Sequence, residues 1–202
     1  MKAAQYVLAT RSAHKAGEII MLLGECGATI ISLDDAGVPV SAAEDGIEVY
    51  ETFRENAIAK ARYFCNAAGM AAIADDSGIM LDALGGLPGV RSRRFSNRPD
   101  LDGTALDRAN NDLAVERLRS ATDRTAHYVC AAALALPDGH TFCAVGSCTG
   151  TFLLEPRGTG GFGYDPHFLV TQADRTFGEM EPAQKHRFSH RARAFRALAP
   201  LL

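Results

Sequence analysis

Apolar and polar stretches alternate along the first part of the chain and predict strands and helices in turn. Short apolar runs at 5–9, 28–33 and 71–74 have the length of buried strands. Helices are predicted over 15–23 and 52–68, where apolar residues recur at helical spacing and a glycine follows as a stop signal. Strands that alternate with helices are typical of an α/β protein.

The helix that begins at Thr52 has the clearest boundaries. Thr52 and Glu55 have the spacing of a capping box, in which each residue satisfies an amide of the other. Apolar residues then follow one helical face, and Gly69 ends the helix. Residues 34–51 have no clear period and are predicted as a loop, with a strand as the alternative.

The second half of the chain adds a hairpin to this pattern. A helix is predicted over 104–119, and two strands over 127–136 and 141–152 flank the turn Pro137-Asp138-Gly139. Residues 155–166 are rich in glycine and are predicted as a loop. The sequence therefore predicts an α/β fold with a mixed sheet.

The composition and the net charge limit the kinds of molecule that the protein is expected to bind. The chain has 202 residues, of which 47% are hydrophobic and 22% charged, so it is neither disordered, collagen-like nor a long coiled coil. Its net charge is -3, whereas a protein that grips nucleic acid through many phosphates normally carries a positive excess. We expect no nucleic-acid partner, but a smaller anion needs only a few cations.

The cysteines and the N-terminus indicate the compartment. The five cysteines are odd in number and have no C-x-x-C spacing, so they indicate buried thiols rather than disulfides or zinc ligands; they are Cys26, Cys65, Cys130, Cys143 and Cys148. Reduced thiols are typical of the cytosol. Arg11 precedes any signal-peptide core, and the longest apolar run, 128–137, is far shorter than a bilayer span. We expect a cytoplasmic protein with no membrane partner.

The pair Asp75-Asp76 is the sharpest chemical signal. It follows the apolar run 71–74 and precedes Ser77-Gly78, so we expect the strand to stop there in a polar turn. Adjacent carboxylates repel each other unless a cation or a proton lies between them. Mg²⁺ is typically held by one or two carboxylates together with substrate phosphates. A helix cap or a solvated turn is the alternative.

Two further segments carry polar or glycine-rich patterns. Gly158 to Gly163 fits a dinucleotide-binding template, but the nearby Pro166 argues against the helix that such a motif opens, and a loop that brings N–H groups to a ligand fits better. Glu181-Pro182 opens a predicted final helix. Its polar residues pair four positions apart on one face, Lys185 with Ser189 and His186 with His190. That face is expected to contact an anionic or aromatic ligand, with zinc or plain solvation as alternatives.

Six segments, in order along the chain, carry a family resemblance. They are Leu8-Ala9-Thr10 with Lys15, Thr52-Phe53-x-Glu55-Asn56-Ala57 with Lys60, Ala74-Asp75-Asp76-Ser77-Gly78, Asp82-Ala83-Leu84-Gly85-Gly86-x-Pro88-Gly89-Val90, Gly160-Gly161-Phe162-Gly163-Tyr164-Asp165-Pro166, and Lys185 with Ser189-His190-Arg191. Together they resemble the inosine/xanthosine triphosphate pyrophosphatase family. The resemblance extends from Val7 to Leu198.

The resemblance implies a fold and an activity. The fold is an elongated α/β molecule, one domain over residues 1–202, in which a central mixed sheet flanked by helices forms two lobes around a cleft. The family is usually homodimeric. Its activity is the Mg²⁺-dependent hydrolysis of non-standard purine nucleoside triphosphates (dITP, ITP and XTP) to the monophosphate and pyrophosphate, which cleanses the nucleotide pool.

The resemblance also assigns roles to residues by motif position. Asp76 matches the general base and metal contact, Glu48 matches a metal ligand, and Ser77 adjoins the substrate. The residues that match phosphate contacts are Thr10, Arg11, Ser12, Lys15 and Lys60. The residues that match the purine enclosure are Phe162, Gly163, Tyr164, Asp165, Lys185, His190 and Arg191.

Two other functions stay open at this point. One is a Maf-like nucleotide pyrophosphatase of the septum-inhibitor type, which acts on modified pyrimidine or other nucleotides. The other is a nucleotide-binding protein without catalysis, because Ser12 and Val49-Tyr50 differ from the residues usual at those positions of the family. Arg91 also differs, since an aromatic residue is common there.

Overall fold

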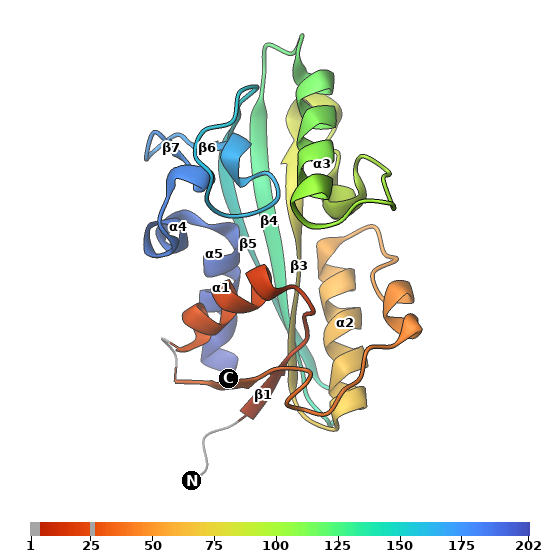
Figure 1. Ribbon diagram of the computed structural model, residues 1–202. Coiled ribbons are helices and arrows are strands. Elements are labelled where there is room, and N and C mark those ends of the chain that lie inside the picture. The colour runs from red at the N-terminus through yellow and green to blue at the C-terminus, as the bar shows by residue number, and fades with distance from the viewer. Residues whose placement is uncertain (1–4, 25–26) are drawn as a thin grey trace. The chain divides into compact units, whose positions relative to one another are not determined.

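Seven strands of the described residues, 5–24 and 27–202, form one mixed sheet in the computed structural model (Figure 1). Its strand order is β2-β1-β3-β4-β5-β6-β7. The strands are β1 (Gln5–Leu8), β2 (Thr29–Ile31), β3 (Ala72–Leu81), β4 (Thr125–Ala135), β5 (Thr141–Phe152), β6 (Phe168–Val170) and β7 (Arg175–Thr176). β1 pairs in parallel with β2 and β3, while β6 pairs antiparallel with β5 and β7. The predicted α/β fold with a mixed sheet is confirmed.

The helices are α1 (Ala13–Gly24), α2 (Phe53–Ala68), α3 (Gly103–Leu118), α4 (Pro182–Phe188) and α5 (His190–Leu198). No helix among the described residues is both long and apolar enough to cross a membrane. The chain divides into two compact units. Unit 1 comprises the described residues up to Asp76, together with 130–146 and 190–202. Unit 2 comprises 77–129 and 147–189, so β3, β4 and β5 contribute residues to both units.

In unit 1, helices pack against both faces of the sheet. Val7 of β1 belongs to a core with α2, whereas its neighbour Leu8 belongs to a core with α1 and α5. The same alternation occurs in β3, where Ala72 and Ala74 face α2 and Ile73 faces α1 and α5. Figure 1 shows α2 on one side of these strands and α1 with α5 on the other. Because successive side chains of a strand point to opposite faces, every second residue of a strand packs against the same set of helices.

The core of unit 2 is built around aromatic rings. The ring centroid of Tyr128 on β4 lies 4.8 Å from that of Phe168 and 5.9 Å from that of Phe177. The rings of Phe168 and Phe177 stack with centroids 5.1 Å apart. Ala114 and Leu118 of α3 belong to the same buried cluster. This core therefore anchors both α3 and the segment around residues 164–180.

The boundaries of α2 follow its sequence signals. The Thr52 hydroxyl accepts a hydrogen bond from the Glu55 N–H at 3.2 Å, and Gly69 ends the helix with a φ of 64°. The second bond differs from the predicted reciprocal box. The Glu55 carboxylate accepts from the Thr52 hydroxyl at 2.6 Å rather than from the Thr52 amide.

The prediction that the strand at 71–74 ends in a polar turn at Asp75 is wrong. β3 continues without a break to Leu81, with Asp75 and Asp76 in its interior. Buried carboxylates are tolerated in a strand where charged or amide side chains compensate them, as they do here. Gly78 lies where an added Cβ would come within 2.3 Å of Ser92 Oγ, so the strand passes a neighbouring segment too closely for a side chain.

The prediction of one final helix is also wrong. Ser189 has an extended backbone, with a ψ of 146°, and its N–H donates to the Lys185 carbonyl at 2.9 Å. α4 therefore ends at Phe188, and α5 begins at His190 in the other unit. His186 and His190 do not share a helical face, which removes the geometric basis of the zinc alternative.

The expectation of buried, reduced cysteines is confirmed for three positions. Cys65, Cys130 and Cys148 are buried, and Cys143 is half-buried. None of these four forms a disulfide. Cys26 lies outside the described residues.

Gly146 gives a test of the packing between β5 and α5. A Cβ at Gly146 would lie 2.4 Å from both the Ala194 nitrogen and the His190 carbonyl oxygen, which are backbone atoms and cannot rotate away. We predict that Gly146→Ala lowers the free energy of unfolding by about 1–3 kcal/mol, measured by urea denaturation.

Gly17→Ala is the matched control. Gly17 lies in α1 with no atom near its missing Cβ. Alanine there is expected to stabilise the helix by about 0.5–1 kcal/mol. Equal effects of the two substitutions would contradict the close approach of α5 to β5.

Candidate active site

β3 directs two adjacent carboxylates to opposite faces of the sheet in unit 1. Continuing its alternation, Asp75 points to the side of α1 and α5, and Asp76 to the side of α2. Both are buried, with exposed fractions of 0% and 6%. The two carboxylates therefore have different neighbours and different electrostatic environments.

Asp75 is compensated by two cations. Its Oδ2 lies 3.3 Å from Lys15 Nζ on α1, and it accepts hydrogen bonds from Nε and a terminal nitrogen of Arg191 on α5, both at 3.3 Å. Arg191 in turn donates to the Glu18 carboxylate on α1. Burial acts to raise the pKa of Asp75, but the charges of Lys15 and Arg191 outweigh it and hold that pKa below its ordinary value. Asp75 is thus a fixed anion.

Asp76 has the opposite character. Its Oδ2 accepts a hydrogen bond from Asn56 Nδ2 at 3.0 Å. Burial and the nearby charge of Glu48 raise the pKa of Asp76 to about 6, although Lys15 and Lys60 act in the other direction. A carboxylate with a pKa near 6 is mostly ionised at neutral pH and still holds a proton well enough to accept one during a reaction. Asp76 therefore has the properties of a general base.

Asn56 connects Asp76 to the loop that carries Glu48. Its Oδ1 accepts from the Tyr50 N–H at 2.9 Å, and its Nδ2 donates to the Tyr50 carbonyl at 3.1 Å. Lys60, one helical turn along α2, forms an ion pair with Glu48. Burial acts to lower the pKa of Lys60, but Glu48 and Asp75 outweigh it and raise that pKa, so Lys60 remains a cation. Glu48, Lys60 and Asp76 thus form one charged cluster in unit 1.

The predicted phosphate loop is built around a turn between β1 and α1. The Ser12 N–H donates to Thr10 Oγ1 at 3.2 Å, and Ser12 Oγ accepts from the Lys15 N–H at 3.4 Å. Arg11 pairs with Glu44 at 2.9 Å and Asp34 at 3.2 Å. Arg11 therefore braces the loop at 34–44, a contact that sequence reasoning did not predict. The phosphate roles of these residues stay predictions.

Unit 2 brings together four residues of the predicted purine enclosure. The Asp165 carboxylate accepts from Lys185 Nζ at 2.6 Å and from the Phe162 N–H at 2.9 Å. Lys185 Nζ lies 5.1 Å from the centre of the Phe162 ring, within range of a cation–π interaction. The Tyr164 hydroxyl donates to the Ser92 carbonyl at 2.8 Å. These contacts fix an aromatic ring, a cation and an anion close together, and we call residues 162–165 the aromatic loop.

The remaining predicted residues divide between the units. Ser77 and Gly163 belong to unit 2, and Gly163 has a left-handed backbone with a φ of 61°. His190 and Arg191 begin α5 in unit 1, where Arg191 donates to Asp75. Their purine contacts stay predictions.

Sequence reasoning missed two residues that hold the site together. Glu18 holds Arg191, and its position three residues after Lys15 on one face of α1 indicated a charged neighbour of Lys15 but not the contact with Arg191. Asn56 lies within one of the family motifs, but no local pattern revealed that its amide would bind Asp76, 20 residues away.

The donor set at Glu48 and Asp76 fits a magnesium ion. Carboxylate oxygens are the hard ligands that Mg²⁺ prefers, and burial together with the charge of Glu48 raises the pKa of Asp76, so a cation bound at the two carboxylates would stabilise the ionised form. Among the described residues, no group of three or more His, Cys, Asp or Glu side chains is placed to hold a metal alone. Two carboxylates suffice for Mg²⁺, which takes its other ligands from water and substrate phosphates.

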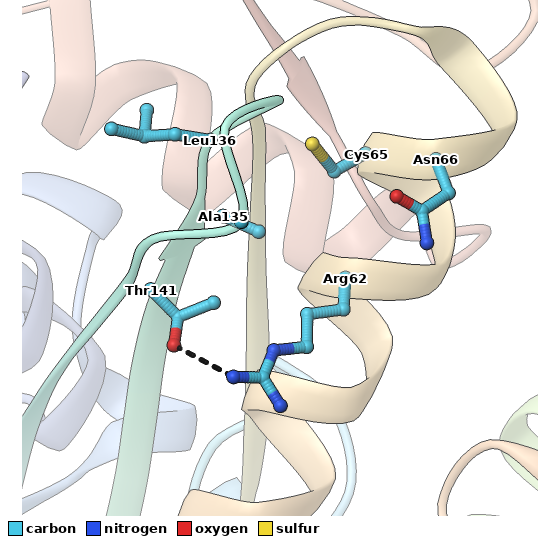
Figure 2. A pocket seen from close by; sticks show the side chains of 7 residues that line it. Arg62, Cys65, Asn66, Ala135, Leu136 and Thr141 are labelled. Atoms are coloured by element: carbon cyan, nitrogen blue, oxygen red, sulfur yellow. Dashed lines mark hydrogen bonds between the residues drawn. The ribbon is translucent and has the colours of Figure 1, made fainter.

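A separate pocket lies between α2 and the turn of the β4–β5 hairpin. Figure 2 shows Arg62 reaching across it to Thr141, with a hydrogen bond of 3.4 Å. The pocket has a volume of about 130 Å³, and Cys65, Asn66, Ala135, Leu136 and Gly139 complete its lining. None of these is a predicted site residue, so this pocket is distinct from the charged cluster.

The mixed sheet, the buried carboxylate pair and the flanking lysines define an α/β protein with a charged site on its sheet. The model of the Ham1 family matches residues 6–201, and the chain belongs to that family. A dITP/XTP pyrophosphatase of Frankia alni is 44% identical over 97% of this chain and 96% of its own length. One of Thermus thermophilus is 42% identical over 98% of this chain and 91% of its own length.

A solved structure agrees with this assignment. The HAM1 protein from Coxiella burnetii is 33% identical, matches 98% of both chains and has a TM-score of 0.84. The family indicated by the sequence resemblance is confirmed.

Arg191→Met tests the compensation of Asp75. Removing one partner of a buried ion pair leaves an unpaired charge, and we predict a loss of about 3–5 kcal/mol in the free energy of unfolding at pH 7. The pKa of Asp75 is lower in the folded protein than its ordinary 3.8, so its ion pairs stabilise the fold fully above that pH. As the pH falls through the folded pKa, this contribution is lost and the difference between variant and parent shrinks.

Urea denaturation at pH 7 and at pH 3 measures both effects. Arg196→Met is the control, since Arg196 is an exposed residue of the same helix. It is expected to change stability by less than about 1 kcal/mol at either pH. A large loss that is the same at both pH values would contradict the assignment of Asp75 as the charge involved.

Proposed function

We propose that this protein hydrolyses non-standard purine nucleoside triphosphates, namely dITP, ITP and XTP, to the monophosphate and pyrophosphate. The relatives from Frankia alni and Thermus thermophilus are named dITP/XTP pyrophosphatases, and each matches nearly the whole chain. The observation that carries the proposal is the charged cluster of unit 1, in which Asp76 has a raised pKa beside Glu48 and two lysines.

The charged cluster performs the bond cleavage in this proposal. Asp76 takes a proton from the water that attacks the α-phosphorus, and the bond from this phosphorus to the oxygen that bridges to the β-phosphorus breaks, releasing pyrophosphate. Lys15 and Lys60 neutralise the charge that spreads over the phosphates. When bound at Glu48 and Asp76, Mg²⁺ supplies further neutralisation and raises the acidity of water. Asn56 holds Asp76 in one orientation.

The aromatic loop recognises the base in this proposal. Phe162 offers a stacking face. Lys185 carries only donors, so it can bind the 6-oxo oxygen of hypoxanthine or xanthine but cannot accept from the 6-amino group of adenine. A site whose buried polar groups are left unpaired by the wrong base discriminates strongly.

We further propose that Mg²⁺ is the cofactor, that the enzyme acts in the cytoplasm and that it is a homodimer. The donor chemistry of Glu48 and Asp76 supports the metal, and the thiols at the four described cysteines support a reducing compartment. The family resemblance supports the dimer. Light scattering on the purified protein measures its mass, and a monomer at micromolar concentration would rule the dimer out.

A substrate panel supplemented with Mg²⁺ tests the proposed function. We expect pyrophosphate release from dITP and XTP with a far higher kcat/KM than from ATP, because the base donors match a 6-oxo purine, and than from GTP, because guanine carries a 2-amino group that hypoxanthine and xanthine lack. Chelation by EDTA should abolish the release. Turnover confined to modified pyrimidine nucleotides would favour the Maf-like alternative. Binding by calorimetry without any product would favour a nucleotide-binding protein without catalysis.

Asp76→Asn tests the general base. We predict a fall in kcat of about 10²–10⁴-fold with dITP, the usual contribution of a positioned base. Since the raised pKa shows that the fold disfavours the charged form of Asp76, the neutral asparagine should leave the metal-free protein at least as stable at pH 7.

Initial rates and urea denaturation provide the two measurements. Asp45→Asn, at an exposed residue of a surface turn, is the control and should retain the parental rate. An unchanged kcat in Asp76→Asn would refute the assignment of the base.

A further inference from the structure

Both backbone polar groups of Gly163, in the aromatic loop, are bound by side chains of α3. The Gly163 N–H donates to Asp107 Oδ2 at 2.7 Å, and Asn111 Nδ2 donates to the Gly163 carbonyl at 2.9 Å. Asp107 and Asn111 are four residues apart, so they lie on one face of the helix. Asn111 as donor and Asp107 as acceptor thus bind a single residue of the loop, and we call these two residues the α3 clamp.

The side-chain amide of Asn111 donates two hydrogen bonds. Its second Nδ2 bond goes to the Asp107 carbonyl at 2.9 Å, and the side chain is buried, with an exposed fraction of 7%. Its Oδ1 is buried and has no hydrogen-bond partner among the described residues. An ionised aspartate has nearly the same shape but no donor, so it cannot hold the Gly163 carbonyl.

Gly163 lies between the two rings of the aromatic loop. Phe162 precedes it, with its N–H bound to Asp165, and Tyr164 follows it, with its hydroxyl bound to Ser92. Gly163 has a φ of 61°, a left-handed conformation that few residues other than glycine adopt. Its peptide groups therefore set how the two rings project, and the α3 clamp fixes those peptide groups.

We propose that Asp107 and Asn111 are positioning residues that hold the aromatic loop in the conformation that receives the base. The inference rests on the proposed function, because that function makes the loop the base-recognition element. A loop already ordered before binding avoids the entropic cost of ordering on substrate. The clamp should therefore affect substrate affinity and base selectivity, while proton transfer at Asp76 in unit 1 proceeds unchanged.

Asn111→Asp is the test, and Asn110→Asp is its matched control. Asn110 is the adjacent residue on α3, is similarly buried at 2% exposure and donates to the Arg93 carbonyl at 2.9 Å. It also accepts from the Ser96 N–H at 2.8 Å, so it holds a different segment from the one that contains Gly163. The two substitutions make the same chemical change in the same helix.

Hydrogen exchange measures the clamp without any substrate. In Asn111→Asp the new carboxylate faces two carbonyl oxygens, and we expect the amides of Phe162 and Gly163 to exchange about tenfold faster or more. In Asn110→Asp these amides should exchange at the parental rate. Unchanged exchange of Phe162 and Gly163 in Asn111→Asp would overturn the clamp, whatever the enzyme does.

Steady-state kinetics measure its role in recognition. Asn111→Asp should raise KM for dITP about tenfold and lower the preference for dITP over dGTP, with kcat within about threefold of the parent. Asn110→Asp should keep both parameters within about twofold. Faster exchange together with unchanged KM and selectivity would overturn the functional role. A parent enzyme inactive on dITP would instead overturn the proposed function, and hydrogen exchange would still decide whether the clamp holds the loop.

Asp107 provides a second pair of variants in case Asn111→Asp does not fold. Asp107→Leu removes the acceptor of the Gly163 N–H, whereas Asp107→Asn retains an acceptor oxygen of the same reach. We expect Asp107→Leu to reproduce the faster exchange and the raised KM, and Asp107→Asn to restore most of the parental behaviour. Equal defects in the two variants would contradict positioning through this hydrogen bond.

Discussion

The buried charge of Asp75 is the constraint on which unit 1 depends. A carboxylate in the interior of a sheet is tolerated only where cations reach it, and Lys15 and Arg191 do so from α1 and α5. Arg191 is itself buried and needs the second anion, Glu18, so the two helices are held against each other and against β3 by one charged network. This compensation allows β3 to continue through the acidic pair instead of turning away.

The neighbouring carboxylate is useful because cations compensate it less fully. Strand alternation directs Asp76 to the α2 side, where burial and the charge of Glu48 raise its pKa, while the pKa of Asp75 stays lowered. Two adjacent aspartates therefore separate into a fixed anion and a group able to exchange a proton. Divergent pKa values in a pair of acids are a common basis for dividing structural and catalytic roles.

Both units use a buried asparagine to fix a loop by its backbone. Asn56 binds the N–H and the carbonyl of Tyr50 and also reaches Asp76. Asn111 binds the carbonyl of Gly163, with Asp107 holding the N–H. In each case a helix supplies polar partners for the backbone of a loop, and a loop whose backbone groups are bound in this way is held in one conformation. The side chains proposed to contact the substrate are thus held in place by polar residues of the neighbouring helices.

The sequence correctly predicted those features that depend on contacts between residues close together in the chain. The cap at Thr52, the stop at Gly69 and the turn at 137–139 depend on neighbouring residues, and they lie where the sequence predicts them. The family resemblance also pointed to Asp76, Lys60 and Lys185 as site residues, and their roles stay predictions. Only the tertiary structure decided that β3 continues past Asp76, that Ser189 separates two helices, and which partners the buried polar groups take. Arg191 meets Glu18 across 173 residues of sequence, and Asn111 meets Gly163 across 52. Such contacts follow from the packing of the whole sheet and its helices, and no local pattern of residue types encodes them.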